Sequence, residues 1–183
     1  ENFGDVRGLT VVFMGDAKNN VANSLMVGCA KLGMNYVACC PDADAPDSEL
    51  VEKCRTIAAE NNCTVTVTSD VEDGTKGAHV IYTDIWVSMG EPASLWEQRI
   101  KELSPYQVNA KVMANAADNA IFMHCLPAFH DTKTTVAQEI EEKFGLTEME
   151  VTDEVFEGSQ SRVFDEAENR MHSIKAVVLA TLR

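Results

Sequence analysis

Short apolar runs alternate with longer segments of helical spacing along the chain, and this alternation constrains the fold more than any other feature. Residues 9–14 are a β-branched apolar run, residues 21–32 repeat their apolar side chains every three to four positions, and residues 36–40 are a second apolar run. A strand-helix-strand unit of about 30 residues is the minimal right-handed crossover between parallel strands. The beginning of the chain therefore predicts a parallel sheet.

The same alternation continues to the C-terminus. We expect further strands at 63–67, 78–83 and 120–123, and helices at 48–61, 94–103, 107–117, 133–144 and from Asp165 onward, with a short helical turn at 69–73. Asp165 is expected to cap the last helix together with Glu168. The third strand is less apolar than the others, which favours a place at the edge of the sheet.

Five strands that alternate with helices predict an α/β fold with one domain over residues 1–183. We expect a doubly wound, Rossmann-like, five-stranded parallel sheet with helices on both faces, in three α/β/α layers. The expected strand order is 3-2-1-4-5. That order places the topological switch point between strands 1 and 4.

Composition limits the classes of partner. The 183 residues carry 15 basic and 29 acidic side chains, a formal net charge of −14. Because phosphate backbones and anionic membranes need clustered Lys and Arg, we expect no nucleic-acid partner and no membrane partner. No apolar run approaches the roughly 20 residues that cross a bilayer, so we expect a soluble, cytoplasmic protein.

The cysteines favour the same compartment. None forms a Cys-x-x-Cys pair, and neither their spacing nor nearby histidines suggest a structural zinc site. Several lie in apolar runs, where a free thiol packs as a small hydrophobe, so a reducing environment is the simpler interpretation. The six are Cys29, Cys39, Cys40, Cys54, Cys63 and Cys125.

Three polar loops, at 15–20, 84–90 and 124–127, follow expected strands 1, 4 and 5. All three leave the carboxyl edge of the sheet, two of them at the switch point, where ligands bind in folds of this class. We therefore expect them to line one crevice. The segment 122–130, Phe-Met-His-Cys-Leu-Pro-Ala-Phe-His, is the most reactive stretch, because it places two histidines and a thiol beside a proline turn.

Each candidate residue also has a purely structural explanation, and the sequence leaves both open. A helix cap is the alternative for Asn20, and a structural carboxylate that binds loop amides is the alternative for Asp16 and Asp84. Simple turns or core packing would account for Ser88, Met89, Trp86, His124 and Cys125, and a solvated helix face for Arg170 and His172.

The crevice offers a limited chemistry. Asn20, Asp84 and Ser88 suit the zwitterionic head of an amino acid, because they supply donors for its carboxylate and an acceptor for its ammonium group. A carboxylate at Asp84 beside the Cys125 thiol would hold a second amine and help take its proton. Nothing resembles a metal cage or a Ser-His-Asp arrangement, although His124 and Cys125 would allow adventitious zinc.

Four motifs in this order resemble a known family. They are Gly-Asp-Ala-Lys-Asn-Asn-Val-Ala-Asn-Ser at 15–24, Asp-Ile-Trp-Val-Ser-Met-Gly at 84–90, His-Cys-Leu-Pro at 124–127 and Glu-Ala-Glu-Asn-Arg at 166–170. The chain resembles ornithine carbamoyltransferase through essentially its whole length. In that family the Asp-x-x-x-Ser-Met-Gly loop marks ornithine rather than aspartate as acceptor, and His-Cys-Leu-Pro separates the ornithine branch from the aspartate enzymes.

The resemblance implies transfer of the carbamoyl group from carbamoyl phosphate to the δ-amine of L-ornithine, which gives citrulline and phosphate, as in arginine metabolism. It implies no metal and no organic cofactor. By similarity, Asn20, Asp84, Ser88 and Met89 bind the α-amino and α-carboxylate groups of ornithine. Cys125 and Asp84 are the implied catalytic pair, which assists deprotonation of the δ-amine.

The resemblance also implies contacts to the second substrate. Cys125, Leu126 and Arg170 would bind carbamoyl phosphate, with the Leu126 backbone carbonyl accepting from the carbamoyl amide and Arg170 helping to hold the molecule. His124 and Pro127 would build the turn at the site. A cis peptide bond before Pro127 is also implied.

Two motifs of the family are absent: the Ser-x-Arg-Thr-Arg phosphate clamp and the His-Pro-x-Gln segment of its first domain. We therefore expect residues 1–183 to be the ornithine-binding second domain alone, with little or no activity. Its partners would be the missing N-terminal domain and, in the full-length enzyme, two further copies in a homotrimer. The last helix would then expose an apolar stripe formed by Ala167, Met171, Ile174, Val178 and Leu182.

Two alternatives stay open. One is a carboxyl-edge site for another acceptor, putrescine or a different amino acid, although the Ser-Met-Gly loop argues against putrescine because that loop serves an α-amino-acid head. The other is a non-catalytic amino-acid-binding module that kept the crevice without the chemistry.

Overall fold

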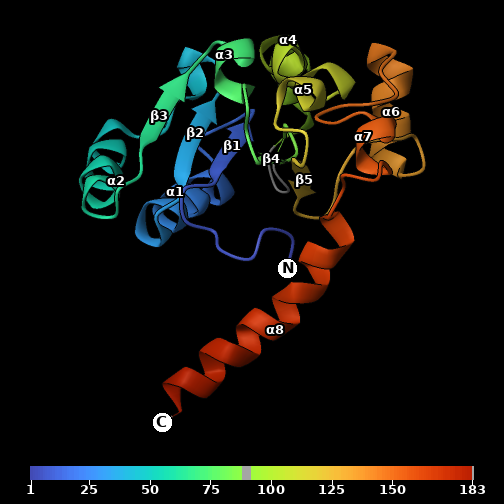
Figure 1. Ribbon diagram of the computed structural model, residues 1–183. Helices are drawn as coiled ribbons and strands as arrows, with labels where there is room; N and C mark the ends of the chain where they lie inside the picture. Colours follow the sequence, from blue (N-terminus) through green and yellow to red (C-terminus); the bar gives the residue numbers. More distant parts are fainter. Residues whose placement is uncertain (88–91, 183) are drawn as a thin grey trace.

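One parallel sheet forms the centre of the molecule. The computed structural model describes residues 1–87 and 92–182, and its strands are β1 (Thr10–Met14), β2 (Asn35–Cys39), β3 (Val65–Thr68), β4 (Val80–Thr83) and β5 (Ile121–His124). The strand order is β3-β2-β1-β4-β5, and every pairing is parallel (Figure 1). The expected order is confirmed, with the less apolar β3 at an edge.

Helices cover both faces of the sheet, which confirms the three-layer prediction. On one face, α1 (Asn20–Leu32) and α2 (Ser48–Glu60) pack over the same side of β1 as Val11 and Phe13. On the other face, α5 (Ala110–Asn115) and α7 (Asp153–Phe156) pack with Val12 and Met14, beside the short α3 (Val71–Thr75). Alternate residues of β1 therefore serve opposite layers, as expected for a strand buried on both sides.

A third apolar cluster lies beyond the carboxyl ends of β4 and β5. It joins Ile85 and Trp86 to Trp96 of α4 (Trp96–Leu103) and to Ile140 of α6 (Thr135–Phe144). In the described part of the chain, three single-turn 3₁₀ helices lie in the loops, at Asp42–Asp44, Ala93–Leu95 and Ser104–Tyr106. This cluster supports the loop segments that leave the carboxyl edge of the sheet.

Several helix boundaries differ from the sequence prediction. The cap of α1 is Asn19, whose side chain accepts from the Ala22 N–H, so the reading of Asn20 as the cap is wrong. The helix expected at 107–117 begins only at Ala110, because Asn109 caps it. The short helix α7 was not expected at all.

The last helix, α8 (Val163–Thr181), begins before Asp165, so the proposed cap at that residue is wrong. Asp165 instead lies in the first turn, where a carboxylate interacts favourably with the helix dipole. Figure 1 shows α8 extending away from the sheet, and its stripe is exposed, as expected: Met171 is 55% and Ile174 52% accessible. No described helix is both long enough and apolar enough to span a membrane.

Candidate functional site

The loops after β1, β4 and β5 meet at the carboxylate of Asp84. The Cys125 thiol donates to Asp84 Oδ1 over 3.1 Å, and the Ile85 N–H donates to the same oxygen over 2.8 Å. The Asn19 side-chain amide lies 3.4 Å from Asp84 Oδ2. The predicted convergence of the three loops is thus present in the fold, and Asp84 with Cys125 lies at its centre.

In the loop after β1, the candidate residues Asn20 and Asp16 lie in different surroundings. Asn20 is the first residue of α1 and is exposed. Asp16 has a structural role, because its Oδ2 lies 3.1 Å from Arg99 Nη2 and its Oδ1 accepts from the Lys18 N–H.

Trp86, in the loop after β4, is buried and belongs to the third apolar cluster, in agreement with its interpretation as a core anchor. The predicted ornithine ligands Ser88 and Met89 lie outside the described residues.

The predicted contacts to carbamoyl phosphate are not all gathered at the crevice. Leu126 and Pro127 are exposed beside Cys125, and the peptide bond between them is cis, as the resemblance implied. Arg170 lies on an exposed turn of α8, and within residues 1–87 and 92–182 its guanidinium has no hydrogen bond or ion pair. The structure therefore joins Asp84 to Cys125 but leaves Arg170 facing solvent.

Cys125 is held in its protonated form. Burial raises its pKa to about 12, and the charge of Asp84, the hydrogen bond to Asp84 and the charge of Glu166 act in the same direction. The Tyr82 hydroxyl opposes this shift, but it donates over 2.6 Å to Glu166. At neutral pH the side chain is therefore a neutral thiol, not a thiolate.

Glu150 is a site residue that the sequence reading missed. Its Oε1 accepts from the Phe129 N–H over 2.6 Å and lies 3.3 Å from His124 Nε2, with both side chains fully buried. His124 Nδ1 faces the Cys125 carbonyl oxygen, whereas Nε2 lies near Glu150 Oε1 without a hydrogen bond to it. Burial lowers the pKa of His124, but the neighbouring Glu150 carboxylate and the Cys125 carbonyl outweigh it and raise the pKa. The only sequence signal was an acidic residue between two apolar ones, Met149 and Val151.

Arg99 was missed for a similar reason. Its guanidinium lies between two carboxylates, 3.1 Å from Asp16 and 3.0 Å from Asp44, and its side chain is only 16% exposed. These ion pairs tie α4 to the loops that follow β1 and β2. In the sequence, Arg99 was one more charged residue of an amphipathic helix.

Among the residues that the structure describes, two groups of side chains bring potential metal ligands together. Asp84, His124 and Cys125 offer ligand atoms within 4.8 Å of one another, and so do His130, Asp153 and Glu157. In the first group Nδ1 of His124 already faces the Cys125 carbonyl, its ring is fully buried, and the thiol is protonated. The first group is therefore poorly prepared for a cation, and the absence of a metal from the reaction stays a prediction.

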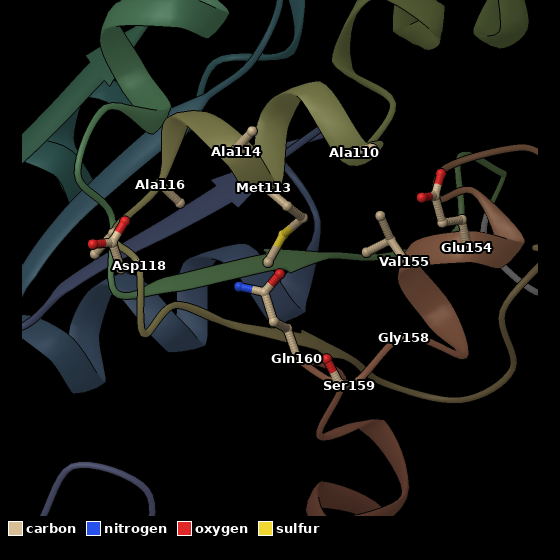
Figure 2. A pocket seen from close by; sticks show the side chains of 11 residues that line it. Ala110, Met113, Ala114, Ala116, Asp118, Glu154, Val155, Gly158, Ser159 and Gln160 are labelled. Carbon is tan, nitrogen blue, oxygen red and sulfur yellow. The ribbon is translucent and has the colours of Figure 1, made fainter.

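One hollow in the helical layer that contains α5 and α7 is separate from the crevice. Figure 2 shows it between α5 and α7, with Met113, Asp118, Glu154 and Gln160 around a cavity of about 520 Å³. The side-chain amide of Gln160 binds the backbone, because its Nε2 donates to the Ala120 carbonyl. None of the predicted site residues that the structure describes lines this cavity, and we assign it no role.

Comparison with known proteins agrees with the resemblance. Residues 7–181 match the family described as aspartate/ornithine carbamoyltransferase, Asp/Orn binding domain. A catabolic ornithine carbamoyltransferase of Treponema denticola is 62% identical over 182 residues, which cover 100% of this chain and 54% of that protein. The catabolic ornithine carbamoyltransferase of Lentilactobacillus hilgardii is 54% identical, over 100% of this chain and 53% of its own length.

Solved structures give the same result. The ornithine carbamoyltransferase from Pyrococcus furiosus superimposes with a TM-score of 0.81 at 39% identity, over 96% of this chain and 50% of that one. The chain spans about half the length of the curated relatives it matches. Motifs, fold and relatives agree that the chain belongs to the aspartate/ornithine carbamoyltransferase family, in the part described as the Asp/Orn binding domain.

Proposed function

We propose that residues 1–183 are the ornithine-binding domain of an ornithine carbamoyltransferase, a transferase that moves the carbamoyl group of carbamoyl phosphate to the δ-amine of L-ornithine. The observation that carries the proposal is the hydrogen bond between Cys125 and Asp84 at the carboxyl edge of the sheet. A carboxylate and a neutral thiol in contact form a site for an amine that must lose a proton. The ornithine carbamoyltransferases named above support the choice of acceptor.

Binding of the amino-acid head is assigned to the loops around this pair. Asn20, Ser88 and Met89, with Asp84, would hold the α-amino and α-carboxylate groups. Asn20 is exposed at the start of α1, so its amide is open to a ligand. The N-terminal end of a helix also favours a carboxylate.

Because the Cys125 thiol is protonated, the Asp84 carboxylate is the group ready to accept a proton from the δ-ammonium. The thiol then acts as a hydrogen-bonding partner that orients the amine. Binding of the ammonium would lower the pKa of Cys125, since a nearby positive charge stabilises a thiolate. The freed amine attacks the carbamoyl carbon and forms the C–N bond. The C–O bond to phosphate breaks, phosphate leaves with the electron pair, and the nitrogen passes its second proton to the departing phosphate.

Carbamoyl phosphate needs more than this chain supplies. Leu126 would offer its backbone carbonyl to the carbamoyl amide, and Arg170 would reach the anion from α8. A net charge of −14 opposes binding of a dianion. We therefore assign the phosphate clamp to a preceding N-terminal domain and expect the 183-residue chain alone to be nearly inactive. The family resemblance further suggests that the full-length enzyme is a homotrimer in the cytoplasm.

The test compares the full-length enzyme with the 183-residue chain. Citrulline formation is measured with ornithine, putrescine and aspartate as acceptors. We expect turnover with ornithine in the full-length enzyme only, and a loss of about 100-fold or more in kcat/KM for Asp84→Asn. Equal turnover of putrescine would overturn the acceptor assignment. If the full-length enzyme binds ornithine but does not turn it over, the alternative of a non-catalytic amino-acid-binding module is favoured.

A further inference from the structure

We propose that Asn19 is a positioning residue that fixes the carboxylate of Asp84 toward the acceptor amine, in addition to capping α1. The inference rests on the proposed function, because it assigns Asn19 a part in that reaction. The sequence reading and the family resemblance place the ligand role on the neighbouring Asn20. The two roles of Asn19 use opposite ends of one amide group.

The cap determines which way the amide of Asn19 points. The Ala22 N–H donates to Asn19 Oδ1 over 2.8 Å, and only an oxygen can accept there. The NH₂ end must therefore face the other way, and it lies 3.4 Å from Asp84 Oδ2. A flipped amide would lose the cap and would set an oxygen against a carboxylate.

The contact between Asn19 and Asp84 matters because the other described hydrogen bonds to the carboxylate all reach its second oxygen, Oδ1. Its Oδ1 receives both the Ile85 N–H and the Cys125 thiol. Among the described residues, Asn19 supplies the hydrogen bond to Oδ2. Without it, the described hydrogen bonds hold the carboxylate at Oδ1 alone, and its rotation about the last side-chain bond is less restricted. A proton acceptor must keep its orientation to within a small angle, since the bond to the amine is directional.

The loop that carries Asn19 is itself held in place. Asp16 accepts from the Lys18 N–H over 2.9 Å, while its other oxygen pairs with Arg99. Asn19 therefore stands on a turn that is fixed at both ends, by Asp16 and by the first turn of α1. Such support is what a positioning group needs in order to hold its neighbour.

Asn109 offers a matched control for the cap alone. Its Oδ1 accepts from the Lys111 and Val112 N–H groups at the start of α5. No described contact links its amide nitrogen to a carboxylate. Substitutions at Asn109 therefore report the stability cost of losing a cap asparagine without the effect on Asp84.

Substitutions at Asn19 separate its two roles in the full-length enzyme. Serine keeps a cap oxygen but is too short to reach Asp84, and aspartate keeps the cap oxygen but turns a carboxylate toward Asp84. We expect Asn19→Ser to lower kcat/KM for ornithine by about tenfold, the effect of one hydrogen bond to a charged group. Asn19→Asp should lower it further, and the KM for carbamoyl phosphate should not change in either variant. Asn109→Ser and Asn109→Ala should shift Tm only.

A second readout does not depend on activity. In the 183-residue chain, the side-chain NH₂ resonances of Asn19 should move in Asp84→Asn, while those of Asn109 stay in place. If they do not move, or if Asn19→Ser keeps the ornithine kinetics of the parent enzyme, Asn19 is only a cap and the proposal is wrong. If the full-length enzyme fails to carbamoylate ornithine, the proposed function fails, yet a moving Asn19 signal would still support its hold on Asp84.

Discussion

His124 Nε2 lies 3.3 Å from Glu150 Oε1, and neither side chain is exposed to solvent. His124 directly precedes Cys125, whose carbonyl faces the other ring nitrogen of His124. Glu150 also receives the Phe129 N–H, so one carboxylate anchors both ends of the turn that carries the thiol. The turn that carries the thiol is thus supported by two fully buried side chains, His124 and Glu150.

Removal of Glu150 should cost more stability than any surface change. Glu150→Ala leaves the buried Phe129 N–H without its acceptor and removes the carboxylate beside His124, and we expect a loss of about 1–3 kcal/mol in the free energy of unfolding. Glu150→Gln should cost less, because it still accepts from Phe129. Urea denaturation measures both, with exposed Glu142→Ala as control at about 0.5 kcal/mol or less. A small effect of Glu150→Ala would show that the pair is not an anchor.

The protein should lose stability in alkaline solution. Burial raises the pKa of Cys29, Cys39, Cys40 and Cys125 from 9.0 to about 12. Because the folded state disfavours the thiolates, their contribution is complete below about pH 9 and is lost as pH rises toward about 12. The free energy of unfolding, measured by denaturant titration at successive pH values, should therefore fall above about pH 9. Cys125→Ser should make this fall shallower, and a flat curve would contradict the assignment.

Alkylation should reveal the influence of Asp84 on Cys125. Five of the six cysteines are buried, so Cys125 is the thiol open to reagent. At neutral pH its reaction with iodoacetamide should be slow, because the thiol is protonated. Asp84→Asn removes a charge that raises the pKa of Cys125, and we expect alkylation to become faster. Asp118→Asn, at the separate cavity of Figure 2, serves as control; a rate unchanged in Asp84→Asn would contradict the coupling.

Arg99 should stabilise the loops at the carboxyl edge. Arg99→Gln leaves Asp16 and Asp44 without the charge that lies between them, and we expect a loss of about 3 kcal/mol. Lys53→Gln breaks a pair with Glu49 in which both side chains are more than half exposed, and it should cost less than about 1 kcal/mol. Thermal or urea unfolding of the two variants makes the comparison. Equal losses would mean that burial adds nothing to the Arg99 pairs.

The sequence by itself determined the sheet and the place of the site. Apolar periodicity is a local signal, so the alternation of strands and helices predicted five parallel strands in the observed order. The same order placed the loops with Asp84 and Cys125 at one edge, where the structure joins them. Family motifs then supplied the chemistry of the crevice.

Only the tertiary structure decided which side chains hold that crevice in place. Glu150 meets His124, and Arg99 meets Asp16 and Asp44, across long stretches of chain. Asn19 rather than Asn20 caps α1 and faces Asp84. These contacts depend on where whole elements pack against one another, and a charged or amide residue carries no local signal of its distant partner. The reactive groups can therefore be identified from the sequence, whereas the side chains that hold them in position can be identified only from the folded structure.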